Sequence, residues 1–120
     1  MRFMMLYKPG VEREAPPTAE EITKMGQLIA EMARAGVLVA TDGLQPSAKG
    51  TRVEIANGAF RVTDGPFAEA KELVAGFAIV DVGSKAEAVE LAKRFLSVVG
   101  EGQSEIRLMH HVPAMVTFQG

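Results

Sequence analysis

The dipeptide Asn57-Gly58 constrains this chain more than any other feature. It separates two short runs, 52–56 and 59–63, that are rich in β-branched and aromatic residues. Asn-Gly between such runs is the strongest short-range signal for a hairpin with a two-residue turn. The turn fixes the register, so the predicted pairs are Ile55 with Phe60, Glu54 with Arg61, and Val53 with Val62. One hairpin face should therefore be apolar, and the other should carry an opposite-charge pair.

Two helices are predicted, each from a capping box followed by an apolar stripe. Thr18 precedes Glu21, and Ser84 precedes Glu87, with the spacing at which hydroxyl and carboxylate satisfy the first free backbone N–H groups. Apolar residues then recur at helical intervals until a glycine stops each pattern. The stripes comprise Ile22, Met25, Ile29, Met32 and Ala33, ended by Gly36, and Ala88, Leu91, Ala92, Phe95 and Val99, ended by Gly100.

Four further strands complete the predicted order. They cover residues 2–7, 37–40, 73–82 and 104–112, and 43–50 is predicted to be a loop. The run 73–82 lacks polar alternation until Asp81, which favours a central strand covered on both faces. Without the hairpin the order is β-α-β-β-α-β, so we expect an α+β, ferredoxin-like fold with an antiparallel sheet and a hairpin insertion. At 120 residues the chain is expected to form one domain, 1–120.

The predicted sheet leaves one face bare. Crossover connections are right-handed, so both helices should cover the same face. The candidates for the other face come from the central strand, Phe77 or Gly76 with Ala78, and from the first and last strands. An apolar sheet face is rarely left in water, so we expect a second copy of the chain to cover it. A homodimer is the predicted assembly.

Composition excludes several classes of function. With 13 basic and 15 acidic residues the net charge is −2, which gives no footprint for direct nucleic-acid binding. Cysteine is absent, so disulfides, thiol nucleophiles and cysteine-based zinc sites are excluded. The apolar run at residues 1–8 is too short for a membrane span or a complete signal peptide, so a cytoplasmic location is expected. No phosphate-binding or dinucleotide-binding glycine motif occurs, and no cofactor is predicted.

The stretch 64–72 is where we look for chemistry. Gly65-Pro66 prevents a helix from crossing it, yet charges crowd beside an aromatic residue. Asp64 either stabilises a turn by bonding to the backbone or lies at a pocket mouth, where its carboxylate acts as a polar anchor or catalytic base. Phe67 is either a core plug or a pocket wall. Glu72, just before an apolar strand, has the same two interpretations as Asp64. Lys71 is either solvated or balances a ligand carboxylate, and either residue could be a charge at the pocket mouth.

Two residues outside this stretch are weaker ligand-binding candidates. Tyr7 ends the first strand and could present its hydroxyl near the same end of the sheet. Asp42, at another Asp-Gly step, has the same two interpretations as Asp64. His110 and His111 are the only histidines, and neighbours on a strand point to opposite faces. No metal site is therefore predicted.

The segment Thr63-Asp64-Gly65-Pro66-Phe67-Ala68-Glu69-Ala70-Lys71-Glu72 resembles the signature of the DGPF-motif proteins of the YCII-related domain family. Other similarities are Tyr7 on the first strand, 35–38, Gly43-Leu44-Gln45-Pro46 and the Gly76-Phe77 strand. The resemblance implies a dimeric α/β barrel built from ferredoxin-like subunits. YCII-type members are thought enzymatic because of a paired histidine and aspartate, and Met25 stands where their helical histidine would lie. Some DGPF domains are fused to sigma-factor-like regions, which implies a link to transcription.

These features support hypotheses of different classes. The first is a dimeric domain that binds a small molecule between the inner sheet face and the loop 64–72, and that could carry acid–base enzymatic activity. The alternative is a non-catalytic regulatory or interaction module that works with a sigma-factor-type protein partner. A third interpretation makes the motif structural, with its loop locking the hairpin to the central strand.

Overall fold

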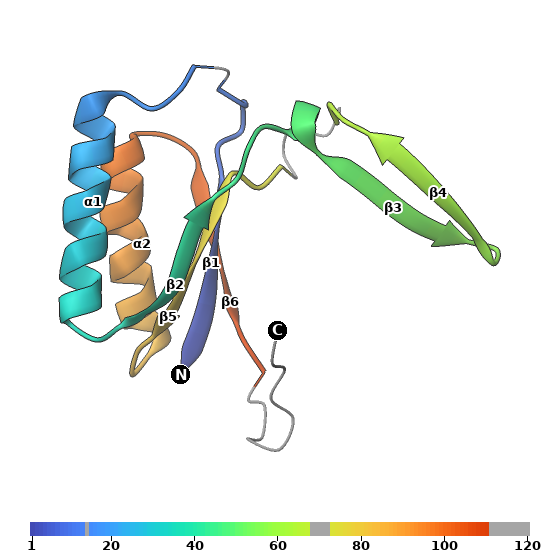
Figure 1. The fold of residues 1–120 in the computed structure, drawn as a ribbon. Helices are drawn as coiled ribbons and strands as arrows, with labels where there is room; N and C mark the ends of the chain where they lie inside the picture. The colour runs from blue at the N-terminus through green and yellow to red at the C-terminus, as the bar shows by residue number, and fades with distance from the viewer. Residues whose placement is uncertain (14, 68–72, 111–120) are drawn as a thin grey trace.

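The computed structural model describes residues 1–13, 15–67 and 73–110. The strands and helices within these ranges follow the predicted order (Figure 1). They are β1 (Arg2–Lys8), α1 (Ala19–Arg34), β2 (Leu38–Gly43), the short 3₁₀ turn η1 (Ser47–Lys49), β3 (Thr51–Ala56), β4 (Ala59–Asp64), β5 (Gly76–Asp81), α2 (Lys85–Val99) and β6 (Gln103–Leu108). None of these helices is long and apolar enough to cross a membrane.

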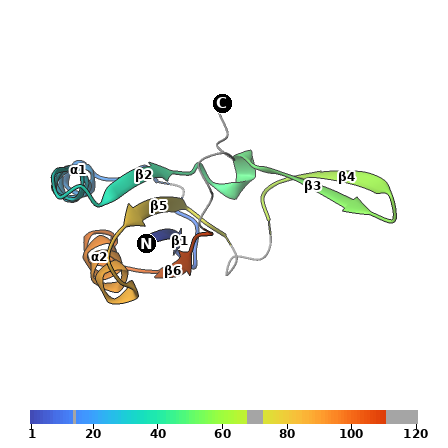
Figure 2. The same ribbon diagram turned by 90° about the horizontal axis from the view of Figure 1, so that it is seen from below.

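The main sheet has the strand order β2-β5-β1-β6, and each neighbouring pair is antiparallel. This is the order of a ferredoxin-like fold, so the predicted fold class is confirmed. Both helices lie on one face of the sheet, and β3 with β4 extends away on the other side (Figure 2). The run predicted as a central strand is indeed interior, because β5 pairs with β1 on one side and β2 on the other.

The core lies between the sheet and the two helices. Alternate residues of the interior strands point toward the helices, as the two-residue strand period requires. The core consists of Phe3, Met5, Val80 and Val82 from the sheet side and Leu28, Met32, Ala88 and Ala92 from the helices. All eight are nearly inaccessible to solvent, which makes this layer the main hydrophobic contribution to stability.

The helix caps form as predicted. The Thr18 hydroxyl accepts the backbone N–H of Glu21 at 3.1 Å, and the Ser84 hydroxyl accepts that of Glu87 at 3.3 Å. Beyond α2, Gly100 adopts the left-handed conformation with φ of 82° and donates its N–H to the carbonyl of Leu96. Each cap satisfies backbone groups that a helix end would otherwise leave unpaired.

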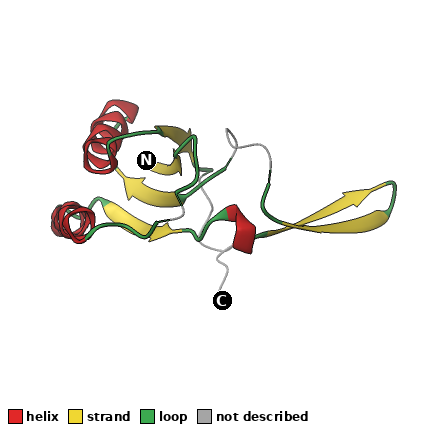
Figure 3. Cartoon of the chain, turned by 90° about the horizontal axis from the view of Figure 1, so that it is seen from above, coloured by secondary structure: helices red, strands yellow, loops and turns green. Residues whose placement is uncertain are grey.

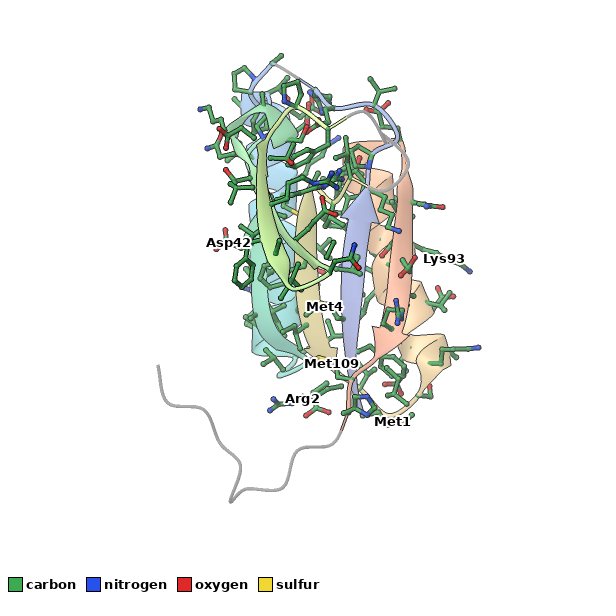
Figure 4. All side chains as sticks on the ribbon, turned by 90° about the vertical axis from the view of Figure 1, so that its right-hand side faces the viewer. Met1, Arg2, Met4, Asp42, Lys93 and Met109 are labelled. Atoms are coloured by element: carbon green, nitrogen blue, oxygen red, sulfur yellow. The ribbon has the colours of Figure 1, made fainter. Side chains whose placement is uncertain are left out.

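The other face of the main sheet carries no helix. Met4 pairs with Ile79, and Leu6 pairs with Phe77, so these four side chains share the face opposite Phe3 and Met5. All four are half-buried, and Met4 is labelled on this face in Figure 4. We call this group the open sheet face.

The predicted hairpin is confirmed in every pair. Val53 faces Val62, Glu54 faces Arg61, and Ile55 faces Phe60 across a turn in which Asn57 and Gly58 both have positive φ. The strands β3 and β4 form a separate two-stranded sheet that projects from the body (Figure 3). We call residues 51–64 the arm.

Three strands differ from their predicted bounds by more than one residue at an end. Strand β2 continues to Gly43, because Asp42 and Gly43 pair with Phe77 and Gly76 instead of forming a turn. Strand β5 begins only at Gly76, since Ala75 donates to Tyr7 and accepts from Leu44 outside the regular ladder. Strand β6 ends at Leu108, and residues 111–112 of the predicted strand lie outside the described ranges.

Candidate functional site

A cavity of about 460 Å³ lies on the helix side of the main sheet, near the C-terminal end of β1. Its walls come from both helices, all four strands of the main sheet and the segment before α1. The apolar lining includes Met5, Met25, Ile29, Ala78, Phe95 and Val99, and the polar lining includes Tyr7, Arg13, Thr41, Asp42 and Ser104. We call this space the helix-side cavity. Apolar surface far exceeds polar surface on its walls.

Tyr7 lies at the base of the helix-side cavity. Its ring meets the edge of Phe95 with centroids 5.3 Å apart, and its hydroxyl donates to the carbonyl oxygen of Glu101 at 3.1 Å. Burial raises the pKa of Tyr7 above its ordinary value of 10.0, and the Glu101 carboxylate raises it further. The phenol is therefore neutral at physiological pH and presents an aromatic wall with its one proton already bonded.

The raised pKa of Tyr7 gives a direct optical prediction. Tyr7 is the only tyrosine, and tryptophan is absent, so near-ultraviolet absorbance follows its ionisation alone. We expect a higher midpoint in the folded protein than in the urea-unfolded chain. Because the folded state holds this proton more tightly, the contribution of Tyr7 to stability is complete below pH 10.0 and is lost as the pH rises through the folded pKa. Equal midpoints would contradict the burial of the phenol.

Arg13 holds the segment before α1 against the helix. Its guanidinium donates to both carboxylate oxygens of Glu21, at 3.0 and 3.1 Å. This pair lowers the pKa of Glu21, mainly through the hydrogen bond from Arg13. Ala15 and Pro17 of the same segment line the cavity, so the ion pair fixes one of its walls. No sequence pattern indicated Arg13, because its partner lies eight residues away in a helix cap.

The second predicted residue at this cavity is Asp42, near the end of the edge strand β2. Its carboxylate is exposed and accepts the backbone N–H of Gly43 at 3.0 Å. The register places Asp42 opposite Phe77 and Thr41 opposite Ala78, so Thr41 shares the helix-facing side with the core. Thr41 itself donates to the carbonyl oxygen of Phe77 at 2.9 Å. Sequence reasoning missed Thr41, since its face depends on a bulge between Leu38 and Ala40.

Asp64 and Phe67 lie elsewhere, at the base of the arm. The exposed carboxylate of Asp64 accepts the hydroxyl of Thr51 at 2.9 Å, which ties the two ends of the hairpin together. The Phe67 ring lies under the guanidinium of Arg52, 3.9 Å from ring centroid to carbon. Neither residue lines the helix-side cavity. A catalytic role for Asp64 and a ligand-binding role for Phe67 stay predictions.

The residues around Phe67 form a compact node. Ser47, which is 8% exposed, accepts the backbone N–H of Phe67 at 3.3 Å and donates its own N–H and hydroxyl to the Glu12 carboxylate. These bonds lower the pKa of Glu12. Gly65 donates its N–H to the carbonyl oxygen of Gly50 at 2.9 Å. We call residues 47–52 with 64–67 the arm root; a hollow of about 330 Å³ beside it is lined by Phe67 and Ser47, among others.

The remaining candidates add no site within the described ranges. Lys71, Glu72 and His111 lie outside them, so their predicted roles are untested. His110 is exposed. Across residues 1–13, 15–67 and 73–110, no group of three or more histidine, aspartate and glutamate side chains could hold a metal ion.

The sequence profile described as YCII-related domain matches residues 1–107. The chain belongs to the YCII-related domain family. Met25, which stands where the family resemblance places the helical histidine, lines the helix-side cavity.

Two further comparisons accompany the family assignment. A search of curated proteins finds no sequence that matches this YCII-related domain. A solved structure that resembles it is 5-chloro-2-hydroxyhydroquinone dehydrochlorinase (TftG) from Burkholderia phenoliruptrix AC1100, in complex with 2,5-dihydroxybenzoquinone. The match has a TM-score of 0.44 and 12% sequence identity, and covers 93% of this chain and 96% of that one. At this distance it says nothing of substrate or reaction.

Proposed function

We propose that this YCII-related domain binds a predominantly apolar small molecule in the helix-side cavity. The observation that carries the proposal is the cavity wall, which is largely apolar and has a few polar groups, Arg13 and Asp42 among them. Small-molecule sites commonly measure about 300–1,000 Å³ and combine apolar walls with a few polar groups that orient the ligand. The cavity of about 460 Å³ has this size and this composition.

The described side chains divide the binding roles between them. Ile29 and Phe95 supply apolar contact from the two helices, and Tyr7 adds an aromatic wall. Arg13 is the charged side chain on the helix side of the lining, so it would orient a polar end of the ligand. The hydroxyls of Tyr7 and Thr41 already bond to backbone carbonyls, and in the ligand complex they would accept rather than donate hydrogen bonds.

The residue at position 25 favours binding over the proton transfer expected of other family members. Methionine has a thioether and no titratable proton, so it can pack against an apolar ligand but cannot act as a general acid or base. The described part of the lining contains no histidine. Met25 therefore makes this part of the cavity wall apolar.

A homodimer is part of the same proposal. The open sheet face presents Met4, Leu6, Phe77 and Ile79 side by side, and no element among the described residues packs over them. Covering such a face with its symmetric equivalent removes apolar surface from water on both copies. Most of the cavity lining lies on the helix side of the sheet, and Phe77 belongs both to that lining and to the open sheet face.

The proposal is tested by filling the cavity. In Ile29→Phe the larger ring would occupy the cavity from α1, so we expect at least a tenfold loss of affinity for an apolar dye, anilinonaphthalene sulfonate, or about 1.4 kcal/mol. Dye fluorescence titrated against protein gives the dissociation constant. Ile22→Phe is the matched control on the same helix, since Ile22 is 59% exposed and does not line the cavity.

The two variants separate the possible outcomes. Equal affinities for the unaltered chain, Ile29→Phe and Ile22→Phe would place dye binding outside the cavity and contradict the proposal. No saturable binding to the unaltered chain would contradict it as well. Circular dichroism of both variants confirms that a loss of affinity does not come from unfolding.

A further inference from the structure

The arm exposes four large apolar side chains to solvent. Val53, Ile55, Phe60 and Val62 are between 64% and 75% exposed, and the cross-strand pairing puts all four on one face. A two-stranded hairpin is marginally stable by itself and gains stability when an apolar face is covered. Nothing within the described residues of the same chain covers this face.

The opposite face of the arm is polar. Arg61 lies within 3.2 Å of the Glu54 carboxylate across the hairpin, and the next pair on this face is Arg52 with Thr63. Glu54, Arg61 and Thr63 are exposed. The arm is thus amphipathic like a core strand pair, although it stands clear of its own core (Figures 1 and 3). An amphipathic element without a partner in its own chain indicates a partner outside it.

The arm root fixes the direction in which the apolar face points. Phe67 packs under Arg52 and beside Gly50, and Ser47 bonds to Phe67 and to Glu12. These contacts join the base of the arm to the segment before α1. The contacts at the arm root therefore hold the arm in a fixed orientation, which an element that docks on another surface requires.

We infer that the apolar face of the arm docks on a second copy of this chain. The arm extends on the same side of the molecule as the open sheet face (Figure 1), so a copy stacked on that face comes within its reach. This step rests on the homodimer proposed above. In a two-fold pair each copy offers one arm and one open sheet face, so both exposed surfaces are covered at once.

The area that a stable dimer needs favours the same occupant. An interface of standard size buries about 800 Å² from each partner. The open sheet face offers four residues that are already half-buried. The arm adds four strongly exposed apolar residues on the same side of the molecule, so a copy that covers both surfaces buries more apolar area than one that covers the open sheet face alone.

Two single-thiol variants test the docking. The chain has no cysteine, so Val62→Cys and Thr63→Cys each carry one thiol, on opposite faces of β4 and with little change in side-chain volume. Both positions are exposed in the single chain. At concentrations where sedimentation shows a dimer, we expect a thiol reagent to modify Val62→Cys at least tenfold more slowly than Thr63→Cys. Dilution to the monomer should make the two rates equal.

A substitution on the apolar face gives the second measurement. Phe60→Ser is expected to raise the dimer dissociation constant at least tenfold, whereas Glu54→Ser, on the polar face, should change it less than twofold. Phe60 is 75% exposed, so the monomer should keep its circular dichroism.

The outcomes distinguish the arm from the rest of the proposed function. A dimer with equal thiol rates and unchanged affinity in Phe60→Ser would overturn the arm inference and leave the homodimer standing. A chain that stays monomeric would overturn both, while dye binding in the cavity would still be judged separately. Protection of the thiol in Val62→Cys only when another protein is added would also overturn the inference, because the occupant would differ.

Discussion

Gly65→Ala is expected to destabilise the arm root more than any other single-methyl change in this chain. A Cβ at this position would lie 1.7 Å from the carbonyl oxygen of Ser47 and 2.7 Å from its carbonyl carbon. Both atoms belong to the backbone, so no rotamer change can make room. Overpacking of this kind costs about 3 kcal/mol, and here it would also break the hydrogen bond from Gly65 to Gly50.

The measurement combines urea unfolding with hydrogen exchange. We expect a lower free energy of unfolding and faster exchange of amides throughout the arm. Gly26→Ala is the control, because a Cβ there meets no atom within 4 Å and helix α1 should gain up to about 1 kcal/mol. An unchanged free energy of unfolding and unchanged amide exchange in the arm of Gly65→Ala would contradict a tightly packed arm root.

The second large effect is expected from Phe3→Ala. Phe3 is 3% exposed, pairs with Val80 on one side and Leu108 on the other, and belongs to the core beneath both helices. Removing a buried phenyl ring costs about 3–5 kcal/mol, from lost transfer energy and from the cavity left behind. For a domain of this size that loss approaches the whole stability, so we expect a large fall in Tm or failure to fold.

Phe60→Ala is the matched control for Phe3→Ala. The same side chain is removed, but Phe60 is 75% exposed, so its loss should change the free energy of unfolding of the monomer by less than about 0.5 kcal/mol. Denaturation is measured at a concentration where the protein is monomeric. Similar losses in the two variants would contradict the division between core and arm.

The parts of the fold that depend on local chemistry were predicted correctly from sequence. Asn57-Gly58 set the hairpin register, and Thr18 and Ser84 capped the two helices as expected. In each case the residues that determine the structure lie within a few positions of one another. The sheet order followed because right-handed crossovers leave few arrangements for this order of elements.

The candidate site was predicted less well, for a physical reason. The walls of the helix-side cavity come from Arg13, Ile29, Thr41 and Phe95, which share no sequence pattern and meet only after the sheet has formed. The stretch 64–72 stood out because its composition is unusual. Its described part contacts residues 47–52, whose composition is that of an ordinary loop and the start of a strand. Of the predicted ligand-binding residues, Tyr7 and Asp42 line the cavity.

The strand order has a consequence for how the chain is made. Strand β1 pairs only with β5 and β6, and β2 pairs only with β5, within the described sheet. A nascent chain that has emerged as far as Asp64 therefore holds a helix and a hairpin but no pair of the main sheet. Its first strand, with Phe3 and Met5, must wait for Gly76 and the residues after it. During synthesis the first half of the chain therefore cannot form the main sheet. The sheet forms only after the second half has been made, through long-range contacts, which form slowly.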